Sequence, residues 1–165
     1  MSRTDRLAYL SAAPGEGLRL GDPHGPHALL TPDGVRVHRV RDTASGVSRT
    51  ETVPWDRVRG LRVDAPVRRR PGLGRALLKG VGALLASDLP TAPRLETEMT
   101  VEVDIASPGG GQADATWRFS VLTMKAGAFS ADDVTPADAL VADLARSPEV
   151  RVRLVDPEAL LAARR

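Results

Sequence analysis

The chain has 165 residues, 42% hydrophobic and 27% charged, which suits one globular domain with a sizeable core. It contains no cysteine, which excludes disulfides, thiol catalysis and thiolate metal sites and fits a reducing cytoplasm. The first ten residues hold no signal-peptide core, and no run of about 18 apolar residues exists anywhere. The sequence therefore predicts a cytoplasmic protein without a transmembrane segment.

Charge is distributed unevenly along the chain, although the net charge is only +2. Residues 35–79 carry twelve Arg or Lys against four Asp or Glu, whereas residues 86–165 carry eight against thirteen. Such a gradient indicates a basic face with an anionic partner. Alternatively, the two sets of charges neutralise each other in the folded protein. The sequence leaves both interpretations open.

Seven short strands are predicted in chain order, at residues 18–20, 28–30, 35–40, 49–53, 58–64, 96–105 and 115–122. The turn that contains Pro32, Asp33 and Gly34 joins the second strand to the third as a hairpin. A glycine-rich turn at residues 108–112 joins the last two strands as a second hairpin. Gly60 is expected to mark a bulge or a close approach of the backbone.

Period-2 alternation identifies the side chains that should lie in the core. Val35 and Val37 share one face of the first hairpin. In the second hairpin, the side chains predicted to be mostly buried are Met99, Val101, Val103, Ile105, Trp117, Phe119 and Val121. Trp55, beside Pro54 at a corner, is interpreted as a hydrophobic plug rather than a ligand-stacking aromatic.

Helical periodicity begins near the C-terminus. Thr135 as N-cap and Pro136 in the first turn start a helix, and Ser147–Pro148 ends it after Arg146. Residues 150–154 alternate again and predict a short edge strand. A last short helix is expected to start at Asp156.

Strands followed by one helix predict a mainly β domain of the α+β class. The segments Leu30-Thr31-Pro32-Asp33-Gly34-Val35 and Val53-Pro54-Trp55-Asp56-Arg57-Val58 resemble bacterial pleckstrin-homology-like (PH-like) domains, in which a similar Pro-Trp-Asp corner often follows a third strand. The resemblance covers roughly residues 18–146. It implies a PH-like barrel of about seven antiparallel strands that the C-terminal helix closes at one corner. Its motifs are packing motifs, and they carry no functional residues.

The resemblance divides the chain into three parts. Residues 1–17 form an N-terminal extension, and residues 18–146 form the barrel with its capping helix. Residues 66–94 are an inserted helical segment within the barrel, and residues 147–165 form a C-terminal strand and short helix.

Catalytic motifs are absent from the sequence: it has no nucleophile elbow, phosphate loop or dinucleotide fingerprint. Asp22, His24 and His27 form a D-x-H-x-x-H pattern, but no further ligand lies nearby at a suitable spacing, and we predict no metal site. The acidic residues near Glu102 share the polar face of one strand and indicate a solvated surface. We therefore expect neither an enzyme nor a cofactor.

One segment, residues 67–86, departs from the β pattern. It holds no acidic residue and five positive charges, at Arg68, Arg69, Arg70, Arg75 and Lys79. Leu73, Leu77, Val81 and Leu84 recur at helical spacing beside them. Basic residues next to an apolar stripe are typical of helices that contact anionic lipid surfaces. An element packed on its own domain, or docked to a partner protein, has the same pattern.

These observations predict a non-catalytic interaction module, located in the cytoplasm or at the inner membrane face. Its basic segment would contact an anionic lipid surface or a partner protein. Nucleic acid ranks lower as a partner, because the chain has only five aromatic residues and no known binding motif. The alternative is a small-ligand-binding protein or an enzyme that uses a polar pocket at the barrel mouth. The sequence defines no oligomeric state.

Overall fold

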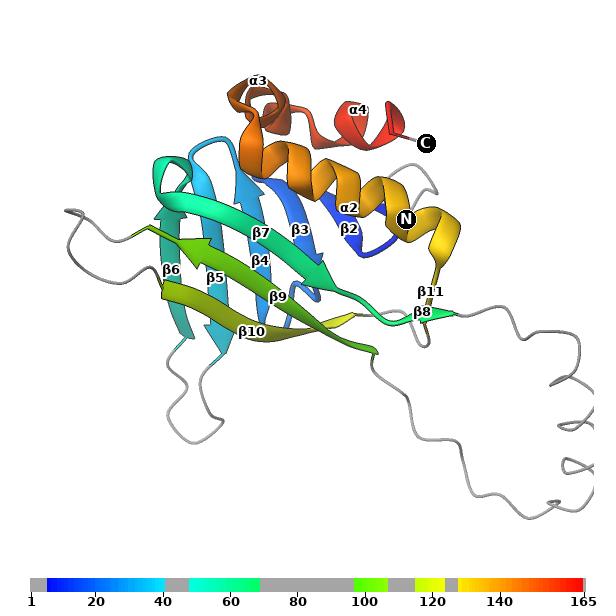
Figure 1. Cartoon of the computed structure of the whole chain (residues 1–165). Helices are drawn as coiled ribbons and strands as arrows, with labels where there is room; N and C mark the ends of the chain where they lie inside the picture. Colours follow the sequence, from blue (N-terminus) through cyan, green and yellow to red (C-terminus); the bar gives the residue numbers. More distant parts are fainter. Residues whose placement is uncertain (1–5, 41–47, 69–96, 107–114, 124–127, 165) are drawn as a thin grey trace, which may run out of the picture.

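The computed structural model describes residues 6–40, 48–68, 97–106, 115–123 and 128–164. Most of this chain is β-sheet, and the larger sheet has six antiparallel strands, each paired with the next along the sequence (Figure 1). They are β1 (Arg6–Leu7), β2 (Leu10–Ala13), β3 (Gly17–Gly21), β4 (His27–Thr31), β5 (Gly34–Val40) and β6 (Ser48–Pro54). Residues 6–13, which were expected in an N-terminal extension over residues 1–17, therefore pair within this sheet.

A second antiparallel sheet has three strands, in the order β10-β9-β7. Its members are β7 (Val58–Asp64), β9 (Thr97–Ile105) and β10 (Ala115–Thr123). Figure 1 shows these strands crossing in front of the six-stranded sheet, and β10 contacts β3 and β4. The two sheets do not close into a barrel within the described residues. The predicted mainly β fold is thus confirmed, and the predicted closed barrel is not found.

The core lies between the sheets, where the strand register lines up apolar residues. Leu18, Leu30, Val35 and Val53 occupy successive strands at aligned positions and are at most 2% exposed. The second predicted hairpin is confirmed, because β9 pairs with β10 along its whole length. Five of its seven predicted core residues are buried, whereas Trp117 and Phe119, on the outermost strand β10, are half-buried.

Two local features explain how the strands turn and bend. Between β4 and β5, the Thr31 hydroxyl bonds to both the backbone N–H and the carbonyl of Gly34, which closes the predicted turn. A side chain at Gly34 would bring Cβ to 2.3 Å from the Val53 carbonyl oxygen, so only glycine fits there. The bulge predicted at Gly60 is confirmed by a register shift between Val58 and Gly60 where β7 pairs with β9.

The C-terminal helix α2 (Ala131–Arg146) packs against β7 and lies across one end of the sheets (Figure 1). It starts five residues earlier than predicted. Ser130 is the N-cap, and its hydroxyl accepts a hydrogen bond from the Asp132 N–H. Its buried stripe is Val134, Ala137, Leu140, Val141 and Leu144. Ser130 also belongs to β11 (Phe129–Ser130), whose parallel pairing with β8 (Val67–Arg68) fixes the entry into the helix.

The chain after α2 is helical. It forms α3 (Pro148–Val152), a 3-10 turn η4 (Arg153–Val155) and α4 (Pro157–Ala162), with Leu154, Leu160 and Leu161 in the core. The edge strand predicted at residues 150–154 is therefore wrong. The alternating apolar residues at these positions do not form a strand, because Pro148 starts a helix and Val152 is exposed rather than buried. None of the helices within the described residues is long and apolar enough to cross a membrane.

Candidate functional site

The predicted basic site lies mostly outside the described residues. Arg68 is the last residue of β8 and is opposite Ser130 of β11, whereas Arg69, Arg70, Arg75 and Lys79 fall in residues 69–96, which are not described. The structure does show where that segment joins the domain. It leaves from β8 and returns as β9, and both strands are paired with other parts of the fold.

Positive charge is concentrated in this segment rather than in the described domain. The described residues carry fourteen arginines and sixteen acidic residues, a net charge of −2. Residues 69–96 carry five basic and two acidic residues, a net charge of +3. The chain is therefore basic because of a segment that is anchored at both ends to a slightly acidic domain.

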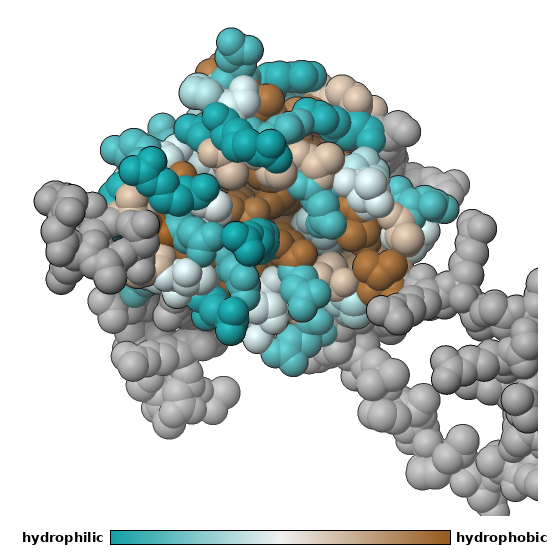
Figure 2. Space-filling view, viewed as in Figure 1, coloured by the Kyte–Doolittle hydropathy of each residue, from teal (hydrophilic) through white to brown (hydrophobic). Residues whose placement is uncertain are grey.

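On the outer face of the three-stranded sheet, opposite charges neutralise each other. Arg62 of β7 lies 3.5 Å from Asp104 of β9, and Arg118 of β10 lies 2.5 Å from Glu102 of β9. Asp104 also accepts a hydrogen bond from the Thr116 hydroxyl. Figure 2 shows hydrophilic residues spread across the face seen in Figure 1, with hydrophobic ones between them. Arg62 and Arg118 are therefore neutralised within the fold. This agrees with the interpretation in which the basic and acidic residues of the chain pair with each other.

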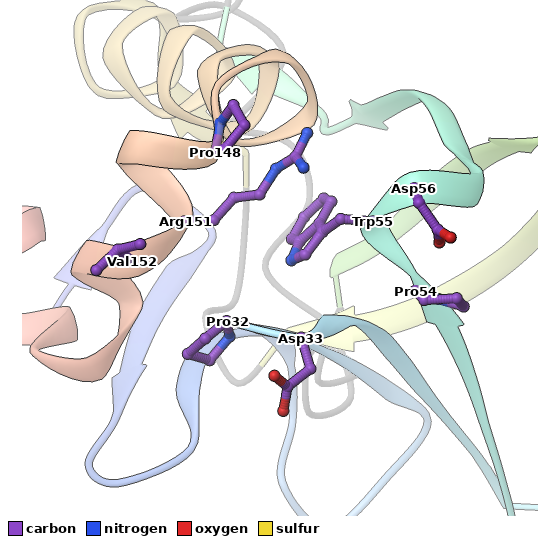
Figure 3. Close-up of a pocket in the computed structure, with 8 residues that line it drawn as sticks. All are labelled: Pro32, Asp33, Pro54, Trp55, Asp56, Pro148, Arg151 and Val152. Atoms are coloured by element: carbon purple, nitrogen blue, oxygen red, sulfur yellow. The ribbon is translucent and has the colours of Figure 1, made fainter.

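A pocket of about 430 Å³ lies where α3 approaches the turn after β6. It is lined by Pro32, Asp33, Pro54, Trp55, Asp56, Pro148, Arg151 and Val152. Trp55 begins the 3-10 turn η2 (Trp55–Arg57), and its indole N–H donates to the Thr31 carbonyl oxygen at 2.8 Å. Figure 3 shows the Arg151 side chain reaching from α3 toward this ring. Trp55 is only 6% exposed, so its ring is buried, as a hydrophobic plug requires.

The polar groups of this pocket serve the fold. Arg151 donates to the carbonyl oxygens of Leu144 and Ala145, both at 2.7 Å, and so satisfies acceptors at the end of α2. Asp33 and Asp56 are exposed. General acid–base or nucleophilic catalysis needs a reactive group held against a second group that activates it, and no such pair lines this pocket.

Asp22, His24 and His27 do not converge on one point. The Asp22 carboxylate accepts a hydrogen bond from the His24 backbone N–H at 2.9 Å, so it closes its own turn. His27 Nδ1 donates to the Gly25 carbonyl at 2.8 Å. Within the described ranges, no group of three His, Asp or Glu side chains is placed to hold a metal ion. These residues also line no part of the pocket at Trp55.

A histidine pair on the six-stranded sheet was not predicted. The rings of His27 and His38 stack with centroids 4.8 Å apart and planes inclined by 30°. Burial lowers the pKa of His27, and the nearby His38 and Arg19 lower it further. The hairpin contained the signal for this pair. Once Thr31 faces Gly34 across the turn, counting outward along both strands places His27 opposite His38.

Comparisons with models of known protein families, with curated proteins and with solved structures found no match. The class of protein is therefore defined by architecture: a mainly β domain of two antiparallel sheets with a C-terminal helix.

Proposed function

We propose that the protein is a non-catalytic interaction module, a variant of the PH-like class, that contacts an anionic membrane surface through residues 67–86. The observation that carries this proposal is the segregation of charge. Without Arg68, the described residues have a net charge of −3, while residues 67–86 hold five basic residues and no acid. Charges that served only to balance the domain would be spread over it, as they are on the outer face of the three-stranded sheet.

The anchoring of the segment supports the same proposal. Paired strands, β8 and β9, hold both of its ends on the domain. Val67 of β8, at the start of the segment, is itself 39% exposed. Near an anionic bilayer each arginine or lysine contributes about 1 kcal/mol, so five give weak binding. This binding should weaken with salt, because a Debye length is about 10 Å at 0.1 M ionic strength.

Co-sedimentation with vesicles tests the proposal. The full chain is mixed with vesicles of phosphatidylcholine alone or with phosphatidylglycerol added, at 50 mM and 300 mM NaCl. We expect binding to the anionic vesicles at low salt only. Replacing Arg68, Arg69 and Arg70 with glutamate should abolish it and leave the circular dichroism spectrum unchanged.

A matched control separates local charge from net charge. Arg59, Arg146 and Arg153 are exposed on the described domain, and their replacement with glutamate changes the net charge by the same amount. We expect this variant to keep most of the vesicle binding. Equal loss in both triple variants, or equal binding of the wild type to both kinds of vesicle, would contradict the proposal.

A further inference from the structure

The outer face of the six-stranded sheet differs from that of the three-stranded sheet. The register places two rows of residues across it, on the side opposite the buried row of Leu18 and Leu30. The first row includes Ser11, Arg19, Leu29, Arg36 and Thr52; the second includes His27, His38 and Thr50. Neither row contains an acidic residue, so no cross-strand carboxylate neutralises the arginines as Asp104 and Glu102 do on the other sheet.

Arg19 holds a hydrogen-bond donor without an acceptor. One end of its guanidinium pairs with Glu16, since Nη2 lies 3.0 Å from that carboxylate. Its Nε is buried, and no acceptor in the described part of the chain lies within hydrogen-bonding distance. Buried donors are nearly always satisfied, so this N–H calls for an acceptor that the described residues do not supply.

Arg36 faces the same area from the other side of Leu29. Adjacent strands are about 4.8 Å apart, so the backbones of Arg19 and Arg36, separated by one strand, are about 10 Å apart. Two arginine side chains can converge across that distance. Leu29 between them is only 6% exposed and forms an apolar floor. Guanidinium groups bind oxyanions through paired N–H donors, an arrangement suited to phosphate.

His27 completes the cluster in the adjacent row. Its Nδ1–H is committed to the Gly25 carbonyl, so the neutral ring presents Nε2 as an acceptor, and the protonated ring presents it as a donor. The ring is buried at 9% exposure and stacks on His38, which fixes its orientation. His38 in turn lies 3.1 Å from the Thr50 hydroxyl, measured from Nδ1.

We propose that Arg19, Arg36 and His27 form a binding site for a phosphate group on the outer face of the six-stranded sheet. A phosphate offers several acceptor oxygens, which match donors arriving from β3, β4 and β5 and satisfy the buried Arg19 Nε. The site lies on the six-stranded sheet, to which neither β8 nor β9 belongs, and it does not depend on the function proposed for residues 67–86.

Isothermal titration calorimetry with inorganic phosphate at pH 7, with ionic strength held constant by NaCl, tests the site. We expect saturable binding, weakened about tenfold by Arg19→Gln and by Arg36→Gln, which corresponds to the loss of one charge-assisted contact each. Arg59→Gln, an exposed arginine of β7, is the matched control and should bind like the wild type. If Arg19→Gln does not fold, Arg36→Gln decides the outcome.

The source of the phosphate group is resolved by two further probes. Glycerol 3-phosphate tests a free phosphate monoester, and vesicles containing phosphatidic acid test a lipid headgroup. If the wild type binds one of these probes, and Arg36→Gln loses that binding while Arg59→Gln keeps it, the site is supported. The probe that is bound identifies the source of the phosphate group. Replacing Arg68, Arg69 and Arg70 with glutamate should leave binding of inorganic phosphate intact, so failure of the proposed membrane contact is distinguishable from failure of this site.

A dependence on pH gives an independent readout. His38, Arg19 and Glu16 face His27, together with the Gly25 carbonyl. Sulfate, whose charge is constant from pH 5.5 to 8, should bind more tightly as pH falls and His27 becomes a donor, and this trend should vanish in His27→Gln. Absence of saturable phosphate binding, or equal weakening by Arg59→Gln, would overturn the proposal.

Discussion

The guanidinium carbon of Arg151 lies 4.8 Å from the centroid of the Trp55 ring. Arg151 belongs to α3 and Trp55 to the turn after β6, so this contact connects the C-terminal helices with the six-stranded sheet. Since the same guanidinium donates to the carbonyls of Leu144 and Ala145, one side chain joins three parts of the fold. The pocket beside Arg151 therefore lies where these three parts of the fold meet, and the free energy of unfolding measures how much their contact contributes.

Replacing Arg151 should destabilise the protein without affecting any binding. We expect Arg151→Ala to lower the free energy of unfolding by about 2 kcal/mol, because it removes two charge-assisted hydrogen bonds and a cation–π contact. Arg151→Lys should recover part of this loss. Urea denaturation measures both, with the exposed Arg153→Ala as control, expected within about 0.5 kcal/mol of the wild type. An equal effect of the two alanine variants would contradict the structural role.

The hydroxyl of Tyr9 donates to the carboxylate of Asp138, which ties the turn between β1 and β2 to α2. Burial raises the pKa of Tyr9 well above its usual value, and Asp138 adds to the shift. Tyr9→Phe should cost about 1 to 2 kcal/mol at pH 7, because it removes the hydrogen bond but retains the edge contact with Phe129.

The same tyrosine should make stability sensitive to alkali. Because the folded-state pKa lies above the unfolded one, the unfolded chain releases the proton first as pH rises above about 10. The stability that Tyr9 contributes is therefore present below about pH 10 and decreases above it. Denaturation of wild type and Tyr9→Phe at pH 7 to 11 should show the difference narrowing above pH 10, and a constant difference would be evidence against this pairing.

Gly17 cannot carry a side chain. Its φ is +126°, and a Cβ would lie 2.1 Å from the Leu30 carbonyl oxygen of the neighbouring strand. We expect Gly17→Ala to cost about 3 kcal/mol or more, because it combines a disfavoured conformation with a backbone clash. Gly25→Ala is the control, since the atom nearest its Cβ lies at 3.9 Å. Thermal unfolding of the two variants should differ clearly, and similar melting temperatures would show that the turn adapts.

Stability should fall as pH drops through the range in which His27 titrates. Burial lowers the pKa of His27 in the folded state, so the unfolded chain binds the proton first as pH falls below about 6.5. The contribution of the neutral ring is thus present above that pH and lost below it. Between pH 7.5 and 5, His27→Gln should lose less stability than the wild type. The exposed His24→Gln should behave like the wild type, and parallel profiles for all three proteins would refute the effect.

The strands were predictable wherever one face is buried, because alternation then follows directly from the pleat. Val35, Val37 and the row from Met99 to Ile105 are examples, and all are at most 3% exposed. The residues at positions 150–154 alternate for a different reason. Leu154 is buried in the 3-10 turn η4, which contacts β3 and β4, so its spacing from exposed Val152 resembles the alternation of a strand. Short helices held by tertiary packing carry no periodicity of their own.

The sites were less predictable than the fold. The stacking of His27 on His38 depends on the register of β4 and β5, which the turn at Thr31 and Gly34 determines. This pair could therefore have been predicted from the sequence. The burial of the Arg19 Nε depends on the orientation of the guanidinium, which pairs with Glu16. The pocket at Trp55 depends on α3, which comes from a part of the chain nearly a hundred residues away. Long-range packing of this kind leaves no pattern in neighbouring residues.

The neighbour-to-neighbour order of β1 to β6 has a consequence during synthesis. Chains emerge from the ribosome N-terminal end first, so residues 6–54 contain every partner that the six-stranded sheet needs before β9 has been made. Local pairings of this kind form early. The inner row at Leu18, Leu30 and Val35 would then face water on the nascent chain until β9, β10 and α2 arrive. The growing polypeptide thus passes through a stage in which one apolar face of the sheet is exposed to water.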